Sequence, residues 1–185
     1  MSEITKHVIA ETFIKLIEEK PLTEITVQEI ANACQISRQA FYYHFEDIYD
    51  LIEWYLTLEA QKLLEGGRSY QTWQRGFLNL FEWAKQNRAI VNHLYNSINR
   101  EQLERFLYQM AFDLVMPVVQ EKQGKSKIST ENLIFIVDFY KFAFVGLLQD
   151  WIGHGMKKDP NDLVDQLSVV IQGSIPYAID RLSEH

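Results

Sequence analysis

The chain has 185 residues, of which 47% are hydrophobic, and its formal net charge is -7. This length suits one moderate domain or two small ones, and the hydrophobic content excludes an intrinsically disordered chain. No apolar run reaches the roughly 18 residues that a membrane span needs, and the first residues lack the basic-then-apolar layout of a secretory signal. Cys34 is the only cysteine, so no intramolecular disulfide can form, and its apolar neighbours favour a core position over a redox role. We therefore expect a cytoplasmic protein.

Helical signals follow one another along almost the whole chain. Pro21 ends the first helix, and Thr26 is the expected N-cap of the second, with Glu29 completing a capping box. Ser37 and Asp47 are the expected N-caps of the third and fourth helices. The predicted helices cover about residues 2–19, 27–34, 38–45, 48–63, 72–86, 88–96, 101–122, 130–154 and 160–182.

The breaks between and within these helices are carried by glycine and proline. Gly66-Gly67 is the clearest break in the chain, and Pro117 predicts a kink in the helix over 101–122. Gly173 and Pro176 predict a bend in the last helix. No alternating Val/Ile-rich segment is bounded by turns, so the sequence predicts an all-α fold.

Residues 37–45, SRQAFYYHF, form the most informative stretch. On a helical wheel Phe41 and Phe45 share one face, which must point to the core, whereas Gln39 and Tyr43 share the opposite face. Arg38 lies in the first turn, where its long side chain reaches past the helix end. Two short helices joined by a tight turn, the second exposing such a face, are typical of a helix-turn-helix. The alternative, an aromatic-rich core helix, leaves the outward Gln and Tyr unexplained.

Residues 26–51, TVQEIANACQISRQAFYYHFEDIYDL, resemble the DNA-binding domain of TetR/AcrR-type transcriptional regulators. The residues that fit the family pattern are Ile30, Ala31, Ser37, Phe41, Tyr42, Tyr43, His44, Phe45 and Leu51. The resemblance implies a helix-turn-helix DNA-binding domain over residues 1–50 and a helical effector and dimerisation domain over residues 51–185. It also implies DNA contacts from Thr26, Ser37, Arg38, Gln39, Tyr42, Tyr43 and His44.

The chemistry of these side chains suits DNA, with two departures from the family. Arginine pairs with guanine or phosphate, glutamine reads adenine, and tyrosine hydroxyls donate to phosphate oxygens. For His44 the alternative is a helix-flank histidine that is bonded locally. Gln35 stands where the family carries glycine, and Ile48 stands where it often carries a phosphate-binding lysine. Residues 1–56 also hold four cations against ten carboxylates, so we expect modest non-specific affinity and a shallow salt dependence.

The helix over 130–154 is apolar around nearly its whole circumference. One face of this helix would pack in its own domain, and another would pack against a second copy of the chain, where Gly146 permits the two helices to approach closely. The alternative is that this helix is the buried centre of a monomer. By resemblance, the last two helices form a four-helix bundle across a twofold axis, so that a homodimer meets a palindromic operator. The effector-pocket candidates are His93, Tyr95, Tyr108, Phe112 and Asp138, although aromatic residues at helical spacing also suit a plain core.

A second resemblance concerns the effector. The run FYYHFEDIYDLIEW and the short, aromatic-rich C-terminal half resemble the branch that contains activators of dihydroxyacetone-kinase operons, in which the effector is a protein co-regulator. The effector is therefore expected to be a small molecule or a protein.

No motif in the sequence predicts an enzyme. Phosphate loops, nucleophile elbows and metal-binding Cys/His spacings are all missing, so we expect no catalytic residues, no cofactor and no metal. The sequence thus predicts a TetR-like homodimeric regulator that binds a palindromic operator, with a DNA affinity that an effector at the C-terminal domain changes. The alternative is a TetR-fold protein with weak intrinsic DNA binding that acts mainly through a protein partner.

Overall fold

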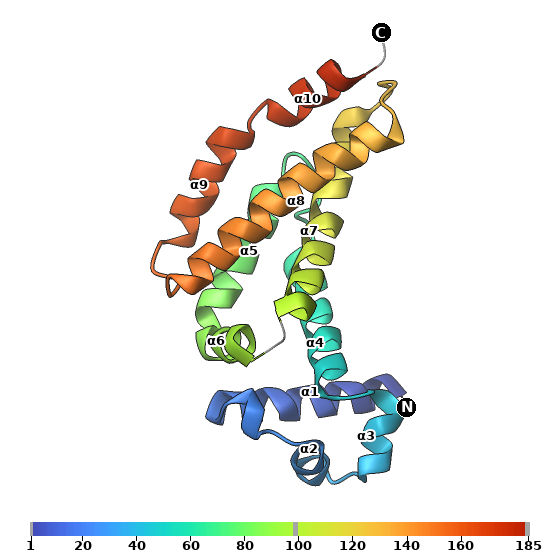
Figure 1. Ribbon diagram of the computed structural model, residues 1–185, viewed down its shortest axis with the longest axis vertical. Coiled ribbons are helices and arrows are strands. Elements are labelled where there is room, and N and C mark those ends of the chain that lie inside the picture. Colours follow the sequence, from blue (N-terminus) through green and yellow to red (C-terminus); the bar gives the residue numbers. More distant parts are fainter. Residues whose placement is uncertain (1, 98–99, 184–185) are drawn as a thin grey trace. The chain divides into compact units, whose positions relative to one another are not determined.

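The computed structural model describes residues 2–97 and 100–183, and over these ranges the secondary structure is helical, without a strand. This confirms the all-α fold class. An isolated antiparallel bridge joins Ile128 and Ser183. None of the helices in the described ranges is long and apolar enough for a bilayer span. The helices in chain order (Figure 1) are α1 (Ser2–Glu19), the 3-10 helix η1 (Leu22–Glu24), α2 (Val27–Ala33), α3 (Arg38–His44), α4 (Ile48–Leu63), α5 (Trp73–Gln86), α6 (Arg88–Ser97), α7 (Arg100–Gln123), α8 (Thr130–Gly153), α9 (Pro160–Ile171) and α10 (Ser174–Leu182).

The last helix was predicted as one bent element, and this is wrong because the chain forms two helices there. Gly173 adopts φ 78°, in the left-handed region, and separates α9 from α10. Pro176 then lies in the first turn of α10, where a missing backbone N–H removes no intrahelical hydrogen bond. The glycine therefore ends one helix and the proline helps to start the next.

The chain forms two compact units. The first comprises Met1–Glu59 and Asn87–Leu103, and the second comprises Ala60–Gln86 and Glu104–His185. α4 therefore passes from one unit into the other, and the boundary expected at residue 50 stays a prediction. In the first unit α1 packs against α2, α3 and α6. Its fully buried side chains include Ile9, Phe13, Ile17, Ile30, Phe41 and Leu51.

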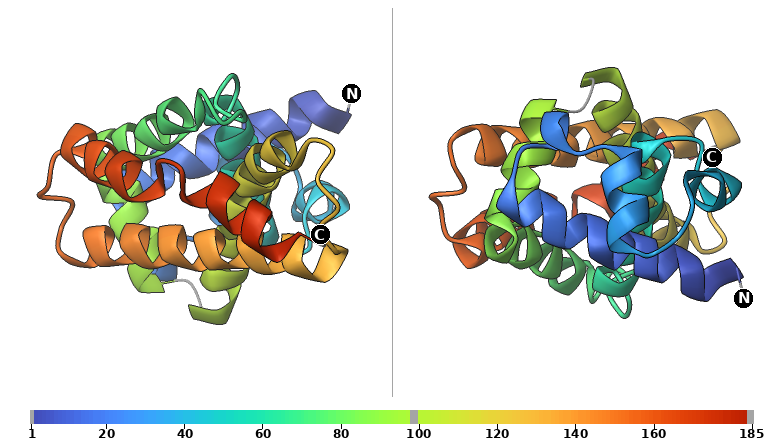
Figure 2. Two further views of the ribbon diagram at one scale, coloured as in Figure 1. Left: turned by 90° about the horizontal axis from the view of Figure 1, so that it is seen from above. Right: turned by 90° about the horizontal axis from the view of Figure 1, so that it is seen from below.

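The second unit is built on an aromatic core. The rings of Phe77 on α5 and Phe144 on α8 lie 4.1 Å apart between centroids, and those of Phe81 and Trp151 lie 4.9 Å apart. α5 packs against α9, and α10 packs against α8. Figures 1 and 2 show α9 and α10 returning beside α8 in the opposite direction. In this arrangement Phe135, Phe139 and Phe142 of α8 remain largely exposed.

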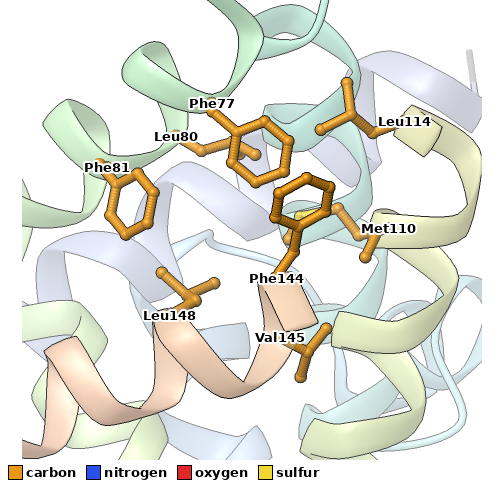
Figure 3. Close-up of a pocket in the computed structure, with 9 residues that line it drawn as sticks. Phe77, Leu80, Phe81, Met110, Leu114, Phe144, Val145 and Leu148 are labelled. Atoms are coloured by element: carbon orange, nitrogen blue, oxygen red, sulfur yellow. The ribbon is translucent and has the colours of Figure 1, made fainter. Parts of the chain in front are cut away.

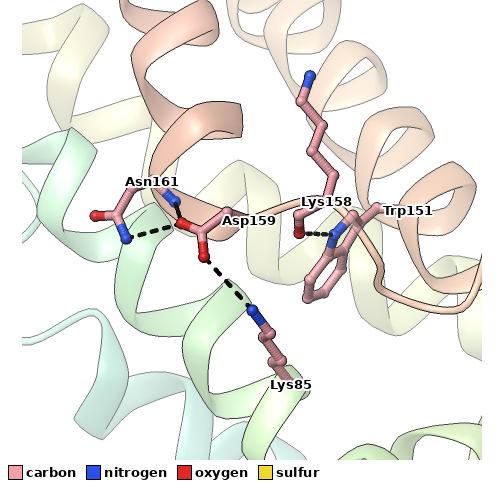
Figure 4. A network of polar contacts seen from close by, with 5 residues as sticks. All are labelled: Lys85, Trp151, Lys158, Asp159 and Asn161. Atoms are coloured by element: carbon pink, nitrogen blue, oxygen red, sulfur yellow. Dashed lines mark hydrogen bonds and ion pairs between the residues drawn. The ribbon is translucent and has the colours of Figure 1, made fainter.

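Polar contacts hold the connection between α8 and α9 in place (Figure 4). Trp151 Nε1 donates to the carbonyl of Lys158 at 2.9 Å. Asp159 caps α9 by accepting from the backbone N–H of Asn161 at 2.9 Å, and Lys85 of α5 lies 3.5 Å from its other carboxylate oxygen. The hydrogen bonds from Asn161 are the main reason why the pKa of Asp159 lies below its usual value. The start of α9 is thereby held on α5.

Candidate nucleic-acid interface

Two side-chain caps and a left-handed turn build the helix-turn-helix. Thr26 Oγ1 accepts from the N–H of Glu29 at 3.2 Å, and Ser37 Oγ accepts from the N–H of Ala40 at 3.1 Å, so both predicted N-caps are confirmed. Between the helices Gln35 adopts φ 57°. Its position is the one where glycine was expected, and the left-handed conformation turns the chain sharply into α3.

The predicted capping box at α2 is only half formed. The carboxylate of Glu29 accepts from Lys20 Nζ at 2.6 and 2.7 Å and so turns away from the Thr26 backbone. An ion pair with two charge-assisted hydrogen bonds is stronger than the single bond to a backbone N–H that the box would provide. The expectation for Glu29 was wrong, because a residue nine positions earlier competes for its side chain.

The inner face of α3 is anchored in the core of the first unit. Phe41 is fully buried and Phe45 nearly so, and their ring centroids lie 5.9 Å apart. Both side chains pack in one cluster with Ile30 of α2 and Leu51 of α4. These contacts fix the rotation of α3 about its axis, and so determine which residues face outward.

The outer face of α3 consists of polar and aromatic side chains. Tyr43 is 81% exposed and Tyr42 47% exposed, and Gln39 and Arg38 are also exposed. Arg38 Nη2 lies 3.5 Å from the Tyr42 hydroxyl, and its guanidinium carbon lies 5.9 Å from the centre of the Tyr42 ring. Tyrosine rings are large apolar surfaces, and two of them exposed on seven residues are typical of a contact surface.

His44 lies at the edge of this face and is half-buried. Its ring meets that of Tyr43 edge-on at 5.1 Å. Its Nδ1 atom is enclosed and finds no hydrogen-bond partner among the described residues. The Nδ1 atom therefore takes part in no local hydrogen bond among the described residues, and the DNA contact of His44 stays a prediction.

The start of α4 offers no cation. Asp47 Oδ1 accepts from the N–H of Asp50 at 2.9 Å, and Asp50 Oδ2 accepts from the N–H of Glu46 at 2.9 Å, which confirms Asp47 as the cap. Ile48 packs against the core cluster of the first unit. At the position where the family often carries a phosphate-binding lysine, this chain therefore has a side chain that packs against the core.

This geometry is accompanied by two matches to family models. Residues 9–54 match the model described as bacterial regulatory proteins, tetR family, and residues 71–173 match the model described as transcriptional regulator C-terminal region. The chain belongs to the TetR family of bacterial transcriptional regulators. This confirms the resemblance that residues 26–51 predicted. Because the family consists of regulators that bind DNA through this motif, the chain is a regulator and not an enzyme.

Individual relatives show the same fold at low sequence identity. The chain is 23% identical over 175 residues to the HTH-type dhaKLM operon transcriptional activator DhaS of Lactococcus lactis subsp. lactis (strain IL1403), covering 92% of both chains. Among solved structures, the dihydroxyacetone kinase operon activator DhaS is 21% identical, with a TM-score of 0.70 and coverage of 98% and 99%. NalD, the secondary repressor of the MexAB-OprM multidrug efflux pump in Pseudomonas aeruginosa, is 20% identical, with a TM-score of 0.59 and coverage of 99% and 98%.

In this TetR-family regulator the five expected effector residues are divided between the two units. His93 and Tyr95 lie on α6 in the first unit. Tyr108 and Phe112 on α7 and Asp138 on α8 gather in the second unit around Lys141. The ammonium of Lys141 lies 2.6 Å from the Asp138 carboxylate and about 6 Å from both rings. The interaction is internal to the chain, and the pocket assignment stays a prediction.

Two cavities of the second unit have other linings. One lies among α5, α7 and α8, with a volume of about 20 Å³ and a lining of apolar residues that includes Phe77, Met110 and Phe144 (Figure 3). This volume holds about one water molecule. The other is an open groove of about 610 Å³ between α8 and α9, with Phe81 of α5 in its lining. The sequence predicted apolar faces on both helices, but the groove depends on their separation, which no local pattern shows.

Proposed function

We propose that this TetR-family regulator binds a palindromic operator as a homodimer and reads the bases with α3. The observation that carries the proposal is the outer face of α3, which is exposed, held in one orientation by Phe41 and Phe45, and rich in groups that bind DNA. Arg38 suits guanine or phosphate, Gln39 suits adenine, and the ring of Tyr43 suits a thymine methyl group. The full set of proposed contacts is Thr26, Ser37, Arg38, Gln39, Tyr42, Tyr43 and His44.

The homodimer part of the proposal rests on an exposed apolar stripe of α8. Phe135 is 65% exposed, Phe139 62% and Phe142 53%, and they form one stripe with Gly146 by their spacing. A Cβ atom added at Gly146 would meet no atom within 4 Å, so the surface there is open to a close approach. Three exposed phenylalanines in a row are unusual for a monomer, and a twofold interface would cover the same stripe on both copies.

The effector part follows from linkage. A ligand changes DNA affinity only if it binds one dimer geometry better than another. An effector bound to the second unit would act through α4, which continues into the first unit. The proposed small-molecule pocket includes His93, Tyr95, Tyr108, Phe112 and Asp138.

A second candidate function is regulation mainly through a protein co-regulator, with weak intrinsic DNA affinity. The observation that favours it is the volume of the cavity among α5, α7 and α8, which at about 20 Å³ is too small for an organic effector. The acidic character of residues 1–56 and the missing cation at Ile48 point the same way. The similarity to activators named for the dihydroxyacetone-kinase operon adds to this alternative.

The DNA-binding proposal is tested by fluorescence anisotropy with a duplex selected from a random library and a shuffled duplex, at two salt concentrations. We expect the wild type to prefer the selected duplex and Tyr43→Ala to lose that preference. Lys15→Met, at an exposed position of α1, serves as the control that keeps this preference. If no duplex is enriched and the wild type binds all sequences equally weakly, the second candidate is favoured.

The dimer is tested by sedimentation velocity. We expect the wild type to sediment as a dimer and Phe139→Asp to sediment as a monomer. Val8→Asp, which places the same charge on an exposed apolar position of α1, should stay dimeric. A wild type that remains monomeric at micromolar concentration would refute the proposed interface.

A further inference from the structure

The cationic side chains of the first unit differ in whether they form an ion pair with a carboxylate. Lys20 is paired with Glu29. Arg38, Lys15 and Lys6 form no ion pair with a described carboxylate. In a segment with ten carboxylates, a cation that stays unpaired keeps its charge available to an outside anion.

Lys6 is held in a defined place without being neutralised. Its ammonium lies 5.6 Å from the ring centre of Phe45 and 5.6 Å from that of Trp54. Ring faces attract a cation but leave its donors free, and a side chain that is already restrained loses less entropy on binding.

The position of Lys6 relates directly to α3. Phe45 follows the last residue of α3, so the Lys6 charge lies beside the end of this helix, whereas Arg38 is its first residue. Seven helical residues span about 10 Å, and the major groove is about 12 Å wide. A helix seated in that groove therefore brings a cation at either end near the phosphates on the two sides of the groove.

We propose that Lys6 of α1 contacts the DNA backbone, opposite Arg38, and supplies the phosphate contact that Ile48 cannot make. The inference rests on the proposed DNA-binding function. It assigns a role to the N-terminal part of α1, whose residues the recognition motif does not include. The contact is to phosphate, so it contributes affinity without sequence preference.

The test compares Lys6→Met with Lys15→Met. Methionine keeps an apolar stem on the two rings and removes the charge. Lys15 is nine positions further along α1, which is half a turn away on the helix and so on its opposite face. Binding is measured by anisotropy with the selected and the shuffled duplex over a series of salt concentrations, and thermal unfolding shows that each variant is folded.

We expect Lys6→Met to weaken binding to both duplexes by the same factor, so that the preference between them is unchanged. The slope of log affinity against log salt concentration should become shallower by about 0.9. The ratio of wild-type affinity to Lys6→Met affinity should therefore fall about 3.5-fold between 50 and 200 mM salt. Lys6→Arg should restore binding, and Lys15→Met should match wild type. Equal behaviour of the two methionine variants, with a wild type that binds, would overturn the role of Lys6 alone. A wild type that binds neither duplex would overturn the proposed function as well.

Discussion

Replacing Gln35 by glycine tests whether the turn between α2 and α3 is strained. Gln35 is exposed, and its backbone adopts φ 57°. A left-handed conformation costs an L-residue about 1–2 kcal/mol, which glycine avoids. Glycine gains about 0.5–1 kcal/mol of freedom in the unfolded chain, which offsets part of this. We therefore expect Gln35→Gly to raise the free energy of unfolding by about 0.5–1 kcal/mol.

Met156 provides the matched contrast because it has nearly the same backbone conformation in a different environment. Its φ is 54°, but its side chain is only 2% exposed. Met156→Gly relieves similar strain and loses the burial of a whole side chain, which is worth about 1.5–3 kcal/mol. The net effect should be destabilisation by about 1 kcal/mol or more, opposite in sign to Gln35→Gly.

Urea unfolding, followed by circular dichroism, measures both variants. The midpoint should move up for Gln35→Gly and down for Met156→Gly, with similar slopes. DNA affinity of Gln35→Gly should equal that of wild type, because the outer face of α3 is unchanged. A lower midpoint for Gln35→Gly would refute the strain argument, and would mean that the Gln35 side chain makes a contribution larger than its backbone cost.

Three further predictions concern other parts of the molecule. Burial, with two nearby glutamates, raises the pKa of Tyr55 from 10.0 to about 12, so folding favours the neutral phenol and stability should be lost as pH rises from about 10 towards 12. Tyr55→Phe should show a shallower decline in urea titrations over that window, and parallel declines would contradict the pKa shift. Tyr70→Phe removes the hydroxyl that accepts from the N–H of Gly173 at 3.3 Å, so hydrogen exchange at that amide should accelerate; unchanged exchange would show that the bond does not hold the α9–α10 break. Gly67→Ala would place a Cβ 2.6 Å from the Gly76 Cα, so we expect a loss of about 1–3 kcal/mol in unfolding experiments, and an unchanged melting temperature would argue against this close approach.

The features that could be predicted from sequence are the local ones. Thr26, Ser37 and Asp47 cap the helices that they were expected to cap, because a cap depends on a side chain and a backbone N–H two or three residues away. The inner and outer faces of α3 follow from helical periodicity in the same way. Glu29 was misassigned because its partner, Lys20, lies outside that local range.

The two cavities of the second unit could not be predicted from the sequence, for a physical reason. A cavity is the space that packed helices leave between them, and it depends on their separation more than on the residue types of any one helix. Tyr108 and Phe112 lie near the internally paired Lys141, and their assignment to an effector pocket stays a prediction. The groove between α8 and α9 arises because α9 packs on α5, a contact between elements far apart in sequence.

α4 belongs to both units of the chain. Leu51 and Ile52 of α4 are buried in the first unit, where they pack in the cluster that contains Phe41 of α3. Ala60, one residue past the end of that unit, is buried in the second unit. Because a helix is stiff over a few turns, a movement that the proposed effector imposed at residues 60–63 would be carried along α4 to residues 48–59, which pack in the same cluster as Phe41 of α3. On the proposed mechanism an effector therefore need not approach α3, since a shift of α4 alone would change how the two copies of α3 are spaced in a dimer.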